Sequence, residues 1–428
     1  MGKAANRPDP ATTVSRVQCA VVGGGPAGLV FALLLARAGI TVTVLEKHGD
    51  FLRDFRGDTV HASTLRLLDE LGLADKLLQI PHRREQCLNL TFDDGKIPAE
   101  DFSRLRGKFN YIVMVPQWEL LNLLAESAKA EPTFDLKMRA DVDELVHTND
   151  RVSGVRYRDE CGTHHELHAD LVVACDGRKS TVRQELGLEM REFGAPMDCV
   201  WVRVPRKDND PDETIIRFSA RGGLIAVHRI DYWQTSMLVG KGQADVALAD
   251  DGALVRSTLA ELAPFLADRV ADLERDKMFK LEVKLNRARK WWVPGALCIG
   301  DAAHAMSPVA GVGVNIAIQD AVAAARYLIP PLRRGHVPNR HLARVQYHRQ
   351  LPVVATQTFQ RLAQKHQIAP SVSAESGEQL RAPAPLRAIN YWPRLGSVLG
   401  RLIGVGLRPE YLTGSLSELR SEPSRRTA

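Results

Sequence analysis

The chain has 428 residues, of which 45% are hydrophobic and 25% charged, and its formal net charge is +6. This is a globular composition, in a chain too long for one ordinary domain. The basic residues are scattered rather than clustered, so nucleic-acid binding is not indicated. The six cysteines form no CxxC pair, which argues against a disulfide scaffold and a metal site and favours a reducing compartment.

Neither a leader nor a membrane span is evident in the apolar pattern. The first sixteen residues are polar and contain two prolines, unlike a signal peptide. No stretch of about twenty uninterrupted apolar residues follows. We therefore expect a cytoplasmic protein without a transmembrane segment.

The first predicted elements form a strand–helix–strand unit, with strands at residues 17–22 and 41–45 and a helix at 27–38. The sequence GGGPAG joins the first strand to the helix and contains GxGxxG. In this pattern Gly23 permits a tight turn, Gly25 lets the backbone approach a pyrophosphate, and Gly28 allows close packing of helix and strand. The helix N-terminus, with Pro26 and Ala27, then favours the anion.

An acidic residue ends the second strand, where a dinucleotide fold needs one. Glu46 follows Gly28 by 18 residues and is suited to accept hydrogen bonds from ribose hydroxyls, with Lys47 beside it. A bare GxGxxG is weak, but the strand, helix and acid are all in place. The pattern predicts a dinucleotide site.

Further elements alternate along the chain. We expect helices at 64–71, 116–129, 254–262, 267–273 and 314–328, and strands at 152–157, 164–167, 171–174, 214–218, 223–230, 235–239 and 297–299. Short strands should also occupy 83–115. The Pro- and Ser-rich stretch 370–385 is expected to be a surface loop.

A second glycine-rich motif stands near the C-terminal third. The strand at 297–299 leads into Gly300-Asp301, and Pro308 and Gly311-Val312-Gly313-Val314-Asn315 lead into the apolar helix. A carboxylate at a strand tip can hold a polyol chain, and a glycine loop feeding a helix offers N–H groups to an anionic ring. Reduced flavin and its ribitol present both groups.

A third motif, CDGRKSTVR, occupies residues 175–183. With these three motifs together, the sequence resembles the FAD-dependent aromatic hydroxylases typified by para-hydroxybenzoate hydroxylase. The resemblance implies that Asp176 lies near the cofactor pyrophosphates and that Arg56 contacts them. It implies further that Gln117 lies near the flavin and that the backbone of Val142, expected in the strand after the Gln117 helix, contacts adenine. The cofactor-binding residues are thus expected to be Gly23, Gly25, Pro26, Ala27, Gly28, Glu46, Lys47, Arg56, Gln117, Val142, Asp176, Asp301, Pro308, Gly311, Gly313, Val314 and Asn315.

The fold implied is α/β, with a discontinuous Rossmann-like FAD-binding domain, a β-sheet substrate domain and a helical C-terminal segment. We assign residues 1–80, 116–195 and 285–345 to the first, 81–115 and 196–284 to the second, and 346–428 to the third. Five residues of the second domain suggest a large apolar cavity, namely Trp201, Arg203, Phe218, Leu224 and Trp233. Residues 394–407, basic and apolar in alternation, are expected to close this cavity, with contact to a membrane surface as the alternative.

The activity implied is an NAD(P)H-consuming monooxygenase. NAD(P)H would reduce the flavin, dioxygen would add to it, and the resulting hydroperoxide would hydroxylate an aromatic or polyketide-like molecule. Such a site needs few catalytic side chains, and none is assigned; His304 and His61 are expected to be structural, and Trp291-Trp292 a packing anchor. The alternatives are a reductase, epoxidase or halogenase of the same fold, or a non-catalytic flavin-binding homologue. A monomer and a homodimer both remain open.

Overall fold

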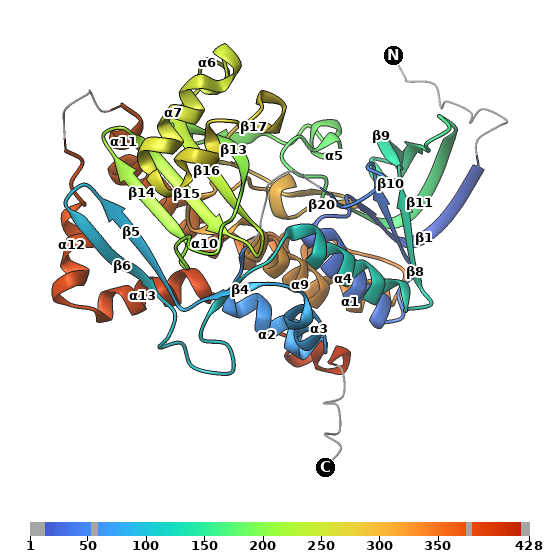
Figure 1. The fold of residues 1–428 in the computed structure, drawn as a ribbon. Helices are drawn as coiled ribbons and strands as arrows, with labels where there is room; N and C mark the ends of the chain where they lie inside the picture. Colours follow the sequence, from blue (N-terminus) through green and yellow to red (C-terminus); the bar gives the residue numbers. More distant parts are fainter. Residues whose placement is uncertain (1–12, 53–58, 374–378, 421–428) are drawn as a thin grey trace.

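A computed structural model of the chain describes residues 13–52, 59–373 and 379–420. Its two main β-sheets lie on opposite sides of a group of helices (Figure 1). The architecture is mixed α/β, as the sequence predicts, and helices form the C-terminal part of the described chain.

The larger sheet has eight strands and a parallel centre. Its order is β19-β20-β11-β1-β2-β8, with β10 beside β11 and β9 beside β10. Parallel pairs join β20, β11, β1, β2 and β8. The strands are β1 (Thr13–Val22), β2 (Val42–Glu46), β8 (Phe134–Met138), β9 (Asp141–Thr148), β10 (Arg151–Arg158), β11 (His164–Ala174), β19 (Trp292–Val293) and β20 (Ala296–Cys298).

The helices beside this sheet build the main core. The helix α1 (Pro26–Arg37) is buried from Ala27 to Ala36 and contacts both α4 (Gln117–Lys129) and α9 (Gly313–Leu332). With its preceding turn, α9 is long and apolar enough to cross a membrane, but 83% of its most apolar window is buried inside the protein. Its apolar character is therefore accounted for by the core.

Two strands that the sequence predicts separately form one strand in the structure. Residues 164–167 and 171–174 are not two strands but the single strand β11. The polar residues His168 and Asp170 interrupt the apolar pattern, yet the backbone stays paired with β1 and β10 through this stretch. Asp170 is accommodated at the surface by an ion pair with Arg16, at 2.8 Å.

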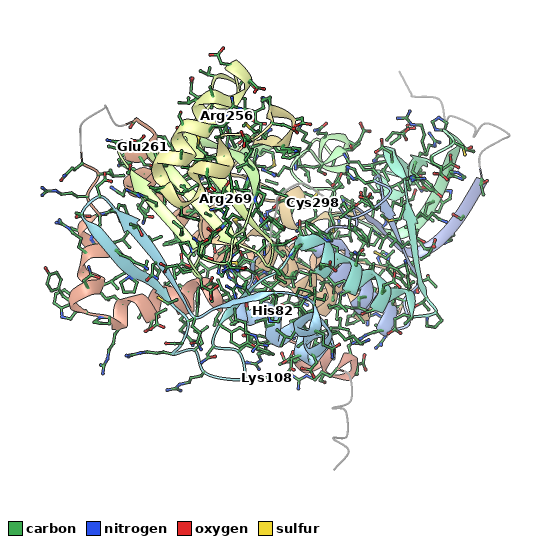
Figure 2. All side chains as sticks on the ribbon, viewed as in Figure 1. His82, Lys108, Arg256, Glu261, Arg269 and Cys298 are labelled. Atoms are coloured by element: carbon green, nitrogen blue, oxygen red, sulfur yellow. The ribbon has the colours of Figure 1, made fainter. Side chains whose placement is uncertain are left out.

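The second sheet has seven strands in the order β17-β13-β16-β15-β14-β5-β6. All of its pairs are antiparallel except β14 with β5. The strands are β5 (Cys87–Phe92), β6 (Gly95–Asp101), β13 (Met197–Pro205), β14 (Ile215–Ser219), β15 (Gly222–His228), β16 (Tyr232–Gly240) and β17 (Met278–Leu281). The helices α7 (Ala253–Leu262) and α8 (Ala267–Val270) cover one face, where Figure 2 labels Arg256 and Arg269.

The two faces of this sheet separate the residues that the sequence analysis grouped as one cavity wall. Leu224 and Trp233 belong to the core beneath α7 and α8, and the Trp233 indole N–H donates to Asp210 at 2.7 Å. Trp201 and Phe218 belong to the cluster on the other face. Assigning Leu224 and Trp233 to the cavity is therefore wrong, because side chains alternate between faces along each strand.

Small sheets and short helices complete the fold. The three-stranded sheet runs β3-β7-β4 and the two-stranded sheet β12-β18. Their strands are β3 (Thr59–Val60), β4 (Arg83–Glu85), β7 (Ile112–Met114), β12 (Met190–Glu192) and β18 (Asn286–Ala288), and the helices are α2 (Ala62–Glu70), α3 (Ala74–Gln79), α5 (Thr181–Glu185) and α6 (Ala244–Ala247).

The C-terminal part is helical and wraps back onto the second sheet. It contains α10 (Asn339–Ala363), a π-turn (Gln364–Ile368), α11 (Ala369–Ser373), α12 (Ala384–Tyr391) and α13 (Arg394–Gly404). The predicted loop at 370–385 is wrong at both ends, since α11 and α12 extend into it. Pro385 is tolerated because it lies in the first turn of α12, where no intrahelical N–H bond is lost, and Pro370, the second residue of α11, comes just after the π-turn.

A buried acid on β6 makes stability depend on pH. Burial raises the pKa of the Glu100 carboxyl from 4.5 to about 7. The folded chain therefore favours neutral Glu100, and stability is lost as pH rises from 4.5 through 7. We expect Glu100→Gln to raise the free energy of unfolding by up to about 3 kcal/mol at pH 8 and to leave it nearly unchanged at pH 4.5.

Denaturant unfolding at both pH values checks this expectation, with the exposed Glu126→Gln as the control variant. Equal effects of Glu100→Gln at the two pH values would contradict it.

Candidate functional site

The three sequence motifs meet at one edge of the larger sheet. The carboxyl ends of neighbouring parallel strands lie together, and the backbone continues the pairing into the loops. The Gly23 N–H donates to Leu45 O at 2.8 Å, Cys175 N–H to Val22 O at 2.7 Å, and Ile299 N–H to Ala174 O at 3.0 Å. Motifs separated by more than 120 residues are thus brought into contact.

The first glycine turn accepts no side chain at two positions. Gly23 has φ +102°, and a Cβ there would lie 2.5 Å from Cys175 O. A Cβ on Gly28 would lie 2.1 Å from Gly23 O. Both contacts are to backbone, so the turn would have to move. The glycines hold the turn tightly against the third motif, residues 175–183, which we call the Asp-Gly motif after Asp176-Gly177.

The N-terminus of α1 is free to bind an anion. Gly25 is its N-cap in an extended conformation, Pro26 occupies the first turn, and no side chain caps the helix. The first N–H groups of a helix have no intrahelical partners, and the helix dipole favours negative charge beside them. A pyrophosphate fits this turn.

Glu46 ends β2 directly beside that turn. Its buried carboxylate accepts hydrogen bonds from Gly24 N–H at 2.8 Å and from His48 N–H at 3.0 Å, and it contacts His48 Nδ1 at 2.7 Å. Lys47, the next residue, is exposed. The carboxylate is therefore fixed at the position where a ribose hydroxyl would reach it.

Asp176 is buried next to the same turn. Burial raises the pKa of its carboxyl, although hydrogen bonds from Ser180 and from Val182 N–H act in the opposite direction. Val182 N–H reaches one carboxyl oxygen at 3.2 Å, while the other oxygen is buried without a hydrogen-bond partner. A buried polar atom of this kind is usually satisfied by a bound group or water.

A single arginine joins two of the motifs. Arg183, buried on α5, donates to Ala302 O and to Arg178 O, both at 2.9 Å. It thereby fixes the turn at Gly300–Ala302 relative to the Asp-Gly motif. Arg178 Nε lies 3.8 Å from the Asp301 carboxylate, whose side chain is 40% exposed, so Asp301 remains accessible to a ligand.

Gly300 explains how the two glycine loops approach each other. It has φ +58°, and a Cβ there would lie 3.1 Å from Ala317 Cβ and 3.4 Å from Ala27 Cβ. The Gly-Asp turn therefore packs between the first turns of α1 and α9. This places Asp301 on the side of the sheet edge where both helix N-termini open.

Asn315 fixes the second glycine loop through its side chain. Its Oδ1 accepts from His61 N–H at 2.9 Å and from Thr64 Oγ1 at 2.7 Å, and its Nδ2 donates to Thr59 O at 3.1 Å. Gly311, with φ +59°, packs closely on Thr59. Because the Asn315 amide is engaged within the protein, it would serve a cofactor by positioning the loop from Pro308 to Gly313. The helix α9 begins at Gly313, and the buried Val314 follows.

Three buried glutamines lie on the C-terminal helical segment, two of them beside the same loop, and none was predicted from the sequence. Gln360 Nε2 donates to Ser307 O at 2.8 Å and to Val309 O at 3.0 Å, and Gln364 Nε2 donates to Ser307 Oγ at 2.8 Å. Gln357 Nε2 donates to Asn286 O at 2.8 Å. Their spacing of three and four residues places them on one helix face, and this polar stripe was the available signal.

A fully buried ion network lies behind the Gly-Asp turn and was also missed. Asp320 on α9 contacts His304 Nε2 at 2.6 Å, accepts from Gly300 N–H at 3.2 Å and pairs with Arg349 Nε at 2.9 Å. Burial acts to raise the pKa of Asp320, but His304 and Arg349 hold it below its ordinary value. His304 thus has the structural position that was expected. Trp291 is also fully buried and packs on the imidazole of His304, with the two ring centroids 4.9 Å apart.

Three further residues were expected at the cofactor site: Gln117, Val142 and Arg56. Gln117 begins α4, and Arg203 stacks over the neighbouring Trp118 ring. Val142 lies in β9, paired with Tyr157, and not in the next strand after α4, which is β8. Arg56 falls outside the described residues.

His61 is a packed residue. Its Nδ1 lies 2.8 Å from Ile403 O of α13, and burial lowers the pKa of its imidazole to about 4. It is therefore neutral at physiological pH and joins the segment before α2 to the C-terminal helices.

The donor set suits a flavin dinucleotide better than a metal. A side-chain-free turn and an uncapped helix can accept an anion, and Glu46 and Asp301 can accept hydrogen bonds from hydroxyl groups. A buried carboxyl oxygen of Asp176 has no hydrogen-bond partner within the protein. Among the residues that the structure describes, no group of three His, Cys, Asp or Glu side chains could hold a metal ion.

Comparisons with known proteins give the same cofactor. The family described as FAD binding domain matches residues 16–361. The chain is 33% identical to 6-methylpretetramide 4-monooxygenase from Streptomyces rimosus, over 78% of this chain and 80% of that protein. It is 28% identical to a 3-(3-hydroxy-phenyl)propionate/3-hydroxycinnamic acid hydroxylase from Burkholderia cenocepacia, over 72% of this chain but only 56% of that longer protein. The solved structure of OxyS anhydrotetracycline hydroxylase from Streptomyces rimosus superimposes with a TM-score of 0.71 at 25% identity, covering 92% of this chain and 77% of that one.

Proposed function

The chain belongs to the FAD-binding family of aromatic-hydroxylase-type monooxygenases, and on that premise we propose that it hydroxylates a polycyclic, polyketide-like phenol. It is an FAD-dependent enzyme with NAD(P)H as electron donor. The observation that carries the substrate class is the 33% identity, over about four-fifths of both chains, to an enzyme named for a pretetramide.

The chain's own residues would bind and orient the cofactor. The α1 N-terminus with Gly23, Gly25, Pro26, Ala27 and Gly28 would hold the pyrophosphate, together with Asp176 and Arg56. Glu46, with Lys47 beside it, would hold the ribose and Asp301 the ribitol, and Val142 would lie near adenine. Gln117 and the loop from Pro308 to Asn315, braced by Gln360 and Gln364, would surround the ring. Bound FAD supplies the redox chemistry that activates dioxygen.

The substrate would lie between that loop and the inner face of the seven-stranded sheet. Val309 of the loop is packed in the same cluster as Trp201 and Ile216 of the sheet, and each of the three is only partly buried. Arg203 follows Trp201 on the same face. These side chains would give a broad apolar wall that positions an aromatic ring system and excludes water.

The domain boundaries follow from this arrangement. We propose that residues 1–80, 116–195 and 285–345 bind FAD and that 81–115 and 196–284 bind the substrate, with 346–428 supporting both. A cytoplasmic location is part of the same proposal.

Substrate-dependent oxidation of NADPH and NADH tests the proposal. With the FAD-loaded enzyme in air, we expect tetracyclic phenols to accelerate cofactor oxidation by roughly an order of magnitude or more relative to monocyclic 4-hydroxybenzoate. Under ¹⁸O₂ the product should gain one labelled oxygen atom.

A preference for monocyclic phenols would overturn the substrate class. Cofactor oxidation that reduces the substrate equally well without dioxygen would identify a reductase instead.

A further inference from the structure

Large apolar side chains stand out from the surface along the C-terminal helices. Of the fourteen that are exposed in the described chain, six lie between residues 391 and 407, with 42% to 79% of their area exposed. We call them the C-terminal apolar face: Tyr391, Trp392, Leu395, Val398, Leu402 and Leu407. Exposed apolar residues gathered in this way mark a binding surface.

The packing of α13 explains why these residues point outward. The helix rests on β6 through glycines spaced by four residues: a Cβ on Gly400 would lie 2.2 Å from Asp101 O, and one on Gly396 2.9 Å from Pro98 O. Ser397 Oγ fastens the helix further by donating to Asp101 at 2.7 Å. Small residues therefore occupy the protein side of α13, and Val398 and Leu402, one turn apart, occupy the outer side.

The charges along this segment are all positive. Residues 379–409 contain no Asp or Glu and five arginines, each of them exposed: Arg381, Arg387, Arg394, Arg401 and Arg408. The last three follow one another at intervals of seven residues. On α13, Arg394 and Arg401 lie along one edge of the outer side, next to Val398.

The position of α12 and α13 leaves this face accessible. Figure 1 shows both helices at one edge of the molecule, outside β5 and β6 and far from β1 and β9–β11. Within 394–407, Ile403 packs into the main core, whereas Leu395, Val398, Leu402 and Leu407 are exposed and therefore do not close a cavity.

A second copy of the chain would fit this face poorly. A twofold contact brings the same patch of both copies together, so arginines would meet arginines without a carboxylate from residues 379–409 to pair with. Arginine beside exposed aliphatic and aromatic side chains instead matches the boundary between lipid headgroups and acyl chains.

We propose that the C-terminal apolar face binds the surface of an anionic membrane. Tyr391, Trp392, Val398 and Leu402 would enter the headgroup boundary without crossing the bilayer, and the arginines would pair with lipid phosphates. This attachment is independent of the reaction at the FAD edge of the larger sheet.

Flotation of the FAD-loaded protein with lipid vesicles tests the proposal. We expect binding to vesicles of phosphatidylcholine mixed with phosphatidylglycerol, little binding to phosphatidylcholine alone, and release by salt. The pairs Val398→Ser with Leu402→Ser and Arg394→Gln with Arg401→Gln should each lower the partition coefficient by roughly tenfold or more. The exposed pair Leu254→Ser with Leu362→Ser is the matched control and should bind as the unmodified chain does.

Flavin content and thermal unfolding verify that each variant is folded. An unmodified protein that stays unbound at low salt, binds neutral vesicles equally well, or binds equally after both face variants would overturn the proposal. So would light scattering that finds a dimer dissociated by the Val398 and Leu402 pair, since the face would then join two copies.

Discussion

Gly23→Ala is expected to lower the affinity for FAD by about 100-fold or more. The added Cβ would lie 2.5 Å from Cys175 O at a residue with φ +102°. Left-handed backbone costs an alanine about 1–2 kcal/mol, and overpacking against fixed backbone adds about 1–3 kcal/mol. The turn would relax by moving away from Asp176, which removes N–H groups from the pyrophosphate position.

Gly39→Ala is the matched control. Gly39 has φ +74°, but no atom lies within 4 Å of the Cβ position. Gly39→Ala introduces the same backbone strain without the collision. The free energy of unfolding of this variant should therefore fall by about 1 kcal/mol, and its affinity for FAD should not change. Flavin fluorescence titration of both apoproteins measures the difference. Equal affinities for the two variants would contradict the role given to the turn.

Asp320→Asn is expected to destabilise the folded chain by about 3–5 kcal/mol, because it leaves the buried Arg349 with only the longer contact, 3.8 Å, to the Glu410 carboxylate. The Arg349 side chain is completely buried, and Asp320 lies 2.9 Å from its Nε. Asp320 also accepts from Gly300 N–H and contacts His304. Loss of the carboxylate should therefore loosen the Gly-Asp turn and lower FAD retention along with the unfolding temperature.

Asp245→Asn is the control variant, because it removes an ion pair that is exposed rather than buried. Asp245 meets Lys280 at 2.7 Å, but its side chain is 75% exposed, so its removal should cost less than about 1 kcal/mol. Adding Arg349→Met to Asp320→Asn should recover part of the loss. A change below about 1 kcal/mol for Asp320→Asn, measured by denaturant unfolding, would show that the network does not hold the turn.

The sequence could predict the centre of the fold because its motifs follow a simple geometric rule. Gly23, Cys175 and Ile299 each follow a buried parallel strand, and the ends of such strands share one edge. The strand–helix–strand pattern of residues 17–45 is local and strongly periodic. Its helix and second strand therefore appear within one residue of the predicted bounds, whereas β1 ends at Val22 as predicted but begins four residues earlier, at Thr13.

The remaining features depend on pairing between distant segments. Trp201 and Trp233 lie on opposite faces of one sheet because Arg203 pairs with Gln234 and Val204 with Trp233, and this register is set by packing that a single strand does not encode. The Gln360 contacts to the loop at Ser307 require α10 to fold back across the chain. The pairing of Asp320, in contrast, could have been recognised from the sequence, because a carboxylate in the middle of an apolar helix signals a buried partner.

The central claim is that separated segments of this chain form one binding site for FAD. Titration of the purified, folded apoprotein with FAD, followed by flavin absorption and by the stoichiometry after desalting, tests it most directly. We expect a yellow protein that retains one FAD per chain, and loss of that FAD in Gly23→Ala but not in Gly39→Ala. A folded protein that stays colourless at high FAD concentration would contradict it.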